Sequence, residues 1–139
     1  MAREILVVDD YVTGRDVTRL ILEKAGYGVL TAEDGSVAIR QVEQHGAVLK
    51  LVLLDMLMPG LDGEQTFQVI RALQADLPCL FFSGFYEAEV FARMQGLGRL
   101  DFLAKPVNVD ELIDKVARML ARHPRTGPTA PPRRLATAA

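Results

Sequence analysis

Five short, largely apolar runs, each separated from the next by a stretch with helical periodicity, constrain the fold of this chain more than any other feature. The runs cover residues 5–8, 28–32, 51–54, 77–82 and 100–104. They lack a regular apolar–polar alternation, as expected of parallel strands that helices cover on both faces. Strand–helix units in series predict a parallel sheet with right-handed crossovers.

The segments between and after these runs show the i, i+3, i+4 spacing of amphipathic helices. Gly26 stands where it would end the first helix, and Asn108 followed by Glu111 is typical of a helix N-terminus. We therefore predict an α/β fold, the flavodoxin-like doubly wound five-stranded parallel sheet with strand order 2-1-3-4-5 and five helices. The positions that carry the helical pattern are Val17, Leu20, Ile21 and Lys24; Ala38, Ile39 and Val42; Phe67, Ile70 and Leu73; Val90, Phe91 and Met94; and Leu112, Ile113, Val116, Met119 and Leu120.

The composition is that of one globular domain. The chain has 139 residues, of which 50% are apolar, so it can bury a single sizeable core. Its net charge of −2 gives no reason to expect nucleic acid or an anionic membrane as a partner. No run approaches the ~20 apolar residues of a membrane span. A single cysteine, Cys79, and the lack of a signal-peptide pattern predict a cytoplasmic protein.

The composition changes after residue 123. Residues 124–139 contain 4 prolines and 3 arginines but no acidic residue. A segment of this kind does not build a core, so we predict a folded domain over residues 1–123 and a disordered tail over residues 124–139. Because its charged blocks are short, we favour a solubilising or linker segment, and binding of an acidic partner by the tail is the alternative.

Ionisable and hydroxyl side chains stand at the carboxyl ends of four of the predicted strands. Asp9 and Asp10 follow the first run, Asp55 the third, Ser83 the fourth and Lys105 the fifth. Open α/β sheets place ligand sites at this edge, near the point where the strand order reverses. We therefore expect these side chains to converge on one site.

This combination of side chains suits a divalent cation and a phosphoryl group. Mg²⁺ needs only one or two carboxylates and keeps several waters, so Asp10 and Asp55 would suffice as direct ligands, with Asp9 acting through water. The cation would relieve the repulsion among the acids and leave Asp55 ionised, as a nucleophile that forms an acyl phosphate. Lys105 would neutralise charge on the equatorial oxygens, and Ser83 would offer its hydroxyl to a phosphate oxygen.

Together these segments resemble the receiver domain of two-component response regulators, the CheY-like superfamily. The resemblance rests on residues 5–10, 53–63, 83–84 and 101–106, and it extends from residue 3 to about residue 121. It implies that Asp55 accepts a phosphoryl group from a histidine kinase or a His-containing phosphotransfer protein. Such a domain catalyses only its own phosphorylation and dephosphorylation.

The resemblance also implies roles for the residues around Asp55. Asp9, Asp10, Asp55 and the backbone carbonyl of Leu57 would surround Mg²⁺ or Mn²⁺, and Lys105 would bind the phosphate. The switch pair would be Ser83 and Phe102. A downstream protein would contact the face formed by the fourth helix, the fifth strand and the fifth helix, without direct contact with nucleic acid or membrane. Homodimer formation stays open.

Four side chains at or near the expected site have consequences of their own. Leu57 and Phe85 are apolar and cannot orient an attacking water, so we expect the phosphate on Asp55 to hydrolyse slowly. Phe102 has no hydroxyl where the family often has tyrosine. Ser83 lacks the methyl group of threonine, so we expect looser coupling between Ser83 and the aromatic ring.

Other functions fit the sequence less well. An aspartyl phosphatase would need an acid–base aspartate where Leu57 stands. A flavin-binding electron carrier of similar fold would meet Asp9 and Asp10 in its phosphate loop, where they would repel the phosphate. A dinucleotide-binding fold would need a G-x-G-x-x-G motif after the first strand, and this sequence has none there. A phosphorylation-independent, receiver-like docking module remains an alternative. So does the choice between a stand-alone regulator and a piece of a hybrid kinase.

Overall fold

The fold is an open parallel sheet between two layers of helices. The computed structural model describes residues 4–83, 92–94 and 96–125, so the predicted tail from residue 126 onwards lies outside it. The strands follow the order β2-β1-β3-β4-β5, which confirms the predicted flavodoxin-like arrangement. The strands are β1 (Ile5–Val8), β2 (Val29–Ala32), β3 (Leu51–Asp55), β4 (Cys79–Ser83) and β5 (Leu100–Ala104), and every hydrogen-bonded pair is parallel.

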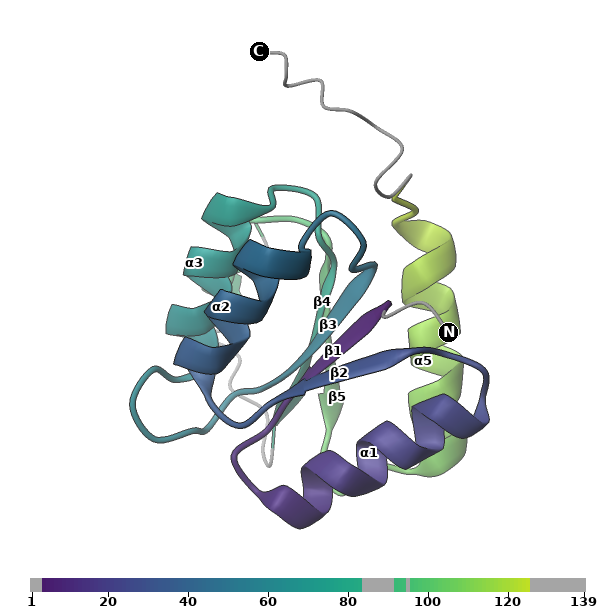
Figure 1. Ribbon diagram of the computed structural model, residues 1–139. Coiled ribbons are helices and arrows are strands. Elements are labelled where there is room, and N and C mark those ends of the chain that lie inside the picture. Colours follow the sequence, from purple (N-terminus) through teal and green to yellow (C-terminus); the bar gives the residue numbers. More distant parts are fainter. Residues whose placement is uncertain (1–3, 84–91, 95, 126–139) are drawn as a thin grey trace.

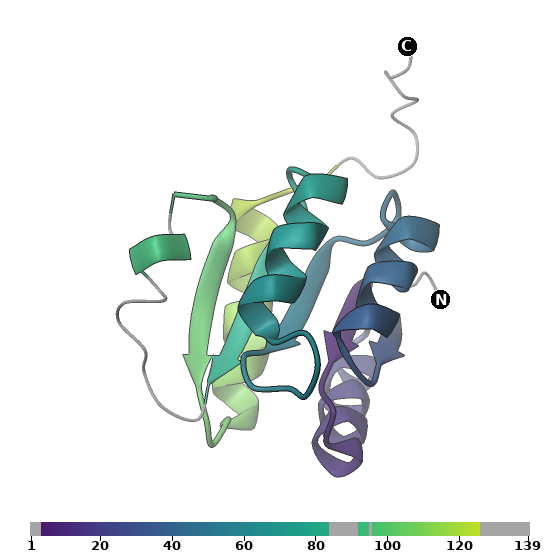
Figure 2. The same ribbon diagram turned by 90° about the vertical axis from the view of Figure 1, so that its left-hand side faces the viewer.

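The helices cover both faces of this sheet (Figures 1 and 2). Helices α2 (Gly35–His45) and α3 (Gly63–Leu73) lie on one face, and α1 (Val12–Lys24) and α5 (Val109–Arg122) lie on the other. The fourth predicted helix falls mostly outside the described residues, which include a helical turn at residues 92–94. None of the described helices is long and apolar enough to cross a membrane.

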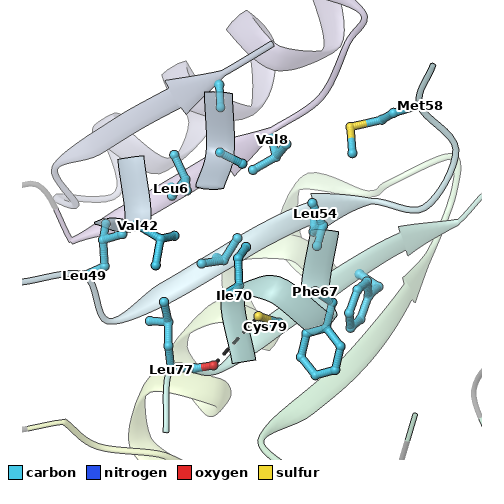
Figure 3. Packing of buried hydrophobic residues seen from close by; sticks show 14 of the residues in the cluster. Leu6, Val8, Val42, Leu49, Leu54, Met58, Phe67, Ile70, Leu77 and Cys79 are labelled. Carbon is cyan, nitrogen blue, oxygen red and sulfur yellow. Dashed lines mark hydrogen bonds between the residues drawn. The ribbon is translucent and has the colours of Figure 1, made fainter. Parts of the chain in front are cut away.

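Each face of the sheet has its own hydrophobic core, because successive strand residues point to opposite faces. Leu6 and Val8 of β1 belong to the cluster beneath α2 and α3, together with Phe67 and Ile70 (Figure 3). The second cluster lies beneath α1 and α5 and includes Ile5, Val7, Leu53, Leu112, Val116 and Met119. Two-sided burial explains why the strands are continuous apolar runs.

The apolar stripe that we predicted for α1 is wrong in part. Val17 and Leu20 are 49% and 56% exposed, whereas Leu22 is fully buried. The inward side of α1 instead runs through Thr18, Ile21 and Leu22. A polar residue thus occupies part of the covered face, so apolar spacing alone identified Ile21 on that face but also selected the exposed Val17 and Leu20.

The helix ends follow from local hydrogen bonding. Asn108 accepts hydrogen bonds from the backbone N–H groups of Asp110 and Glu111, which confirms it as the N-cap of α5. Asp62 and Gln65 form a capping box that starts α3 directly after the loop that follows β3. Caps of this kind fix where the loops at the carboxyl edge end.

Arg125, which we assigned to the tail, belongs to the folded domain. Its side chain is 8% exposed and donates hydrogen bonds to the carbonyl oxygens of Gly46 (2.9 Å) and Leu49 (2.6 Å). It also donates to Gln74 Oε1 (2.7 Å) and Asp76 Oδ1 (2.9 Å). The folded part therefore extends past the predicted boundary at residue 123, because this guanidinium ties the end of α5 to two loops.

Candidate functional site

Asp9, Asp10 and Asp55 converge at the carboxyl end of the sheet. One carboxylate oxygen from each lies within 4.8 Å of the others. The strands β1 and β3 are hydrogen-bonded neighbours, so the acids that end or follow them are brought together, as the topology predicted. Asp9 and Asp55 are buried, at 6% and 5% exposure, whereas Asp10 is exposed to solvent.

The turn between β1 and α1 holds Asp9 through its backbone and its side chain. Asp9 Oδ1 accepts a hydrogen bond from the backbone N–H of Tyr11 at 2.9 Å. The Arg15 guanidinium donates to the carbonyl oxygen of Asp9, also at 2.9 Å. Three residues separate β1 from α1, so the first turn of the helix folds back beside Asp9.

Both carboxylate oxygens of Asp55 have a hydrogen-bond donor. Lys105 Nζ donates to Oδ2 at 3.0 Å, and the backbone N–H of Leu57 donates to Oδ1 at 3.1 Å. Because β4 lies between β3 and β5, the long lysine side chain spans the end of one strand to reach Asp55. A Cβ at Gly63 would lie 2.6 Å from the Asp55 carbonyl oxygen, so the loop returns to the strand only with glycine there.

The site carries more negative than positive charge. Three carboxylates and one ammonium group give −3 + 1 = −2 when all are ionised. Burial raises the pKa of Asp9 above its usual range, and the nearby Asp55 charge adds to this increase, against the Tyr11 N–H and the Lys105 charge. A cation bound among these carboxylates would act in the opposite direction and lower the pKa of Asp9.

The donor set fits a small divalent cation of the Mg²⁺ type. All three side chains offer oxygen, which Mg²⁺ prefers. Two oxygens on opposite sides of Mg²⁺ are about 4.2 Å apart, and the three carboxylate oxygens here all lie within 4.8 Å of one another. Leu57 contacts Asp55 through its N–H, and a role for its carbonyl as a ligand stays a prediction.

Two further predicted residues, Ser83 and Phe102, belong to β4 and β5. Ser83 is the last residue of β4 and pairs in register with Ala104, but its side chain, like all of Phe85, lies outside what the structure describes. Phe102 is partly buried and stacks on Phe81. The side chain of Leu57 is 59% exposed.

An apolar groove of about 410 Å³ opens beside the acidic cluster. It lies between α1 and the segment that leads from β5 into α5, and Asp9 and Lys105 form its edge on the side of the acids. Its lining includes Tyr11, Val17, Ile21, Val107 and Leu112. The exposed Val17 thus belongs to a surface next to the candidate site.

Sequence reasoning missed two residues that shape the site, Arg15 and Gly63. Gly63 directly follows the capping Asp62, and a glycine at the first position of a helix could have indicated a close approach. Arg15 carries no comparable signal, because it acts by donating from its side chain to a backbone carbonyl six residues away.

Known proteins share both the sequence pattern and the fold. The family model described as response regulator receiver domain matches residues 5–117. The CAI-1 autoinducer sensor kinase/phosphatase CqsS of Vibrio cholerae is 36% identical over 83% of this chain, which spans only 17% of that relative. Sporulation initiation phosphotransferase F of Bacillus subtilis is 30% identical over 86% of this chain and 95% of its own length. The crystal structure of the receiver domain of NtrX from Brucella abortus, 33% identical, has a TM-score of 0.77 over 85% of this chain and 98% of that chain.

Proposed function

This chain belongs to the response regulator receiver domain family, and on that premise we propose that Asp55 accepts a phosphoryl group from a histidine kinase or a His-phosphotransfer protein. The observation that carries the proposal is the environment of Asp55. Its carboxylate is 5% exposed, lies beside two other acids, and accepts a hydrogen bond from Lys105. A buried carboxylate in this setting is fixed in orientation and shielded from bulk water.

The transfer would proceed by nucleophilic attack of an Asp55 oxygen on phosphorus. The new O–P bond forms while the P–N bond of the donor phosphohistidine breaks, and its electron pair returns to the imidazole nitrogen. Lys105 would then move its ammonium group from the free carboxylate to the equatorial oxygens, where charge gathers in the transition state. The N–H of Leu57 would keep the other carboxylate oxygen in place.

Asp10 and Asp55 would hold Mg²⁺ directly, Asp9 would act through water, and the Leu57 carbonyl would complete the protein ligands. When bound, the ion supplies positive charge that offsets both the acids and the incoming phosphoryl oxygens. Mn²⁺, which also prefers oxygen ligands, would fit the same donors. The clustering of the three carboxylates supports this part of the proposal.

Phosphorylation would be read by protein contact. The added charge at Asp55 would draw the Ser83 hydroxyl toward the phosphate and change the packing of Phe102 at the surface of β5. A downstream protein would bind the fourth helix, β5 and α5. The apolar groove, which Asp9 and Lys105 line on one side, would offer a phosphodonor protein a surface near Asp55. A receiver fed by a histidine kinase in this way would act in the cytoplasm.

Intact mass spectrometry after incubation with a small phosphodonor and Mg²⁺ tests the proposal. The wild-type chain should gain one phosphate, and Asp55→Asn should gain none. Asp114→Asn, which removes a carboxylate that is 63% exposed on α5, should behave like the wild type. No gain by any variant would favour the alternative, a phosphorylation-independent docking module.

A further inference from the structure

Gly14, in the first turn of α1, faces the carboxylate of Asp9. A Cβ built on Gly14 would lie 2.9 Å from Asp9 Oδ2 and 3.4 Å from a ring carbon of Tyr11. The first distance is shorter than real Cβ atoms show, so a side chain at position 14 would require the Asp9 carboxylate to move. The second distance is an ordinary contact.

Conformational freedom does not account for this glycine. Among the described glycines, the positive φ angles belong to Gly26, Gly60 and Gly98, whereas Gly14 lies within a regular helix. A helix with an internal glycine is less stable than the same helix with alanine, because the glycine backbone loses more conformational freedom on folding. Gly14 therefore lowers the stability of the helix, but the absence of a side chain leaves enough clearance for Asp9 Oδ2.

Asp9 has little freedom to adjust elsewhere. Its Oδ1 is held by the Tyr11 N–H, and its backbone carbonyl is held by Arg15. Displacing Oδ2 would therefore rotate the carboxylate while Oδ1 and the backbone stay hydrogen-bonded. The distances from the Asp9 oxygens to those of Asp10 and Asp55 would change. The geometry of the acid cluster thus depends on the missing side chain at position 14.

We propose that Gly14 is a positioning residue of the cation site, and that it acts by leaving room for the Asp9 carboxylate. The inference rests on the proposed function, since it takes Asp9, Asp10 and Asp55 as the site of Mg²⁺. It assigns to Gly14 an effect on cation affinity that is separate from its effect on helix stability. Alanine at this position should favour the helix and weaken the site.

Calorimetric titration of the full chain with Mg²⁺ alone, without phosphodonor, tests this separation. Gly14→Ala should bind Mg²⁺ on the order of tenfold more weakly, the size of effect seen when the support of a metal ligand is disturbed. Its melting temperature without Mg²⁺ should stay equal or rise, which also shows that folded proteins are compared. Thr13→Ala, an exposed neighbour in the same turn, should leave the affinity unchanged.

A double-mutant cycle decides whether Gly14 acts through Asp9. Mn²⁺ binding followed by electron paramagnetic resonance is measured for the wild type, Gly14→Ala, Asp9→Ala and the double variant. In the Asp9→Ala background, Gly14→Ala should change the affinity by less than about twofold.

Equal affinity of Gly14→Ala and the wild type would overturn the inference. A similar loss of affinity caused by Gly14→Ala in the wild-type and in the Asp9→Ala background would also overturn it, because Gly14 would then act independently of Asp9. A wild-type chain that binds neither Mg²⁺ nor Mn²⁺ would overturn the proposed cation site itself, which is a different outcome.

Discussion

Phe81 and Phe102 stack on each other across neighbouring strands, with ring centroids 5.1 Å apart and ring planes at 27°. The register of β4 and β5 pairs these two residues directly. Phe81 also meets Phe67 of α3 edge to face, at 5.2 Å. The aromatic residue that we propose for the switch is therefore packed against an aromatic cluster that reaches α3.

The stacked pair should show an interaction energy of its own. Phe81→Leu should lower the free energy of unfolding by about 1–2 kcal/mol, because the ring is fully buried. In a double-mutant cycle with Phe102→Leu, urea denaturation should give a coupling energy of about 1 kcal/mol. Phe81→Leu combined with Leu73→Ala, at the exposed end of α3, should be additive. If the effects of Phe81→Leu and Phe102→Leu on the free energy of unfolding were additive, that result would contradict the stacking.

Arg125 should contribute more to stability than an arginine on the exposed side of the same region. Arg125→Ala leaves two backbone carbonyls without their donor and removes a buried side chain, so we expect a loss of about 3 kcal/mol in urea denaturation. Arg122→Ala is the control, since Arg122 is 63% exposed and lies 3.9 Å from Asp101. Its effect should stay within about 0.5 kcal/mol. Equal effects of the two substitutions would contradict the role of Arg125.

Asp9 should make the metal-free protein less stable at neutral pH than at low pH. Its folded-state pKa is raised above the usual 3.8, so the folded state binds the proton more tightly than the unfolded state. The resulting cost is absent below the unfolded-state pKa and fully present above the raised one. With a chelator present, Asp9→Asn should therefore stabilise the protein at about pH 7, by on the order of 1 kcal/mol.

The same substitution should lose most of its advantage near about pH 3, where Asp9 is largely protonated in both the folded and the unfolded state. Denaturant unfolding at the two pH values measures the difference, and Asp114→Asn on the exposed side of α5 serves as the control. An Asp9→Asn variant that is less stable than the wild type at neutral pH would show that the Asp9 charge is not a source of repulsion.

The sheet was predictable because burial on both faces leaves an unmistakable pattern. Residues 5–8 and 51–54 are apolar without interruption, and the structure buries all of them. The convergence of Asp9, Asp55 and Lys105 then follows from parallel topology, which aligns the carboxyl ends of the strands. These parts of the fold and of the site depend on rules that act along the whole chain.

Other features depend on contacts that no periodic pattern encodes. Arg125 follows a proline in a polar segment, and its acceptors are carbonyls of loops that are remote in sequence. The inward side of α1 contains Thr18, so the apolar positions Val17 and Leu20 suggested the wrong face. The burial of a partly polar side chain, or of one that binds backbone atoms, can be recognised only when the fold is known.

Leu57 should make the phosphorylated state long-lived. Its side chain is 59% exposed beside Asp55 and has no polar group to orient an attacking water. After removal of the phosphodonor, Leu57→Asn should lose its phosphate on the order of tenfold faster than the wild type, as followed by intact mass. Leu57→Met, which stays apolar, is the matched control. Wild-type decay within minutes that asparagine does not accelerate would count against this role.

The location of the phosphate tests the central proposal most directly. Borohydride reduction converts an aspartyl phosphate into homoserine, and tandem mass spectrometry of the digested chain identifies the residue that changed. We predict the change at Asp55 alone, and its absence when Mg²⁺ is removed with a chelator. A change at another residue, such as Asp9 or Asp10, or no change in the wild-type chain, would contradict the assignment of Asp55 as the phosphoacceptor.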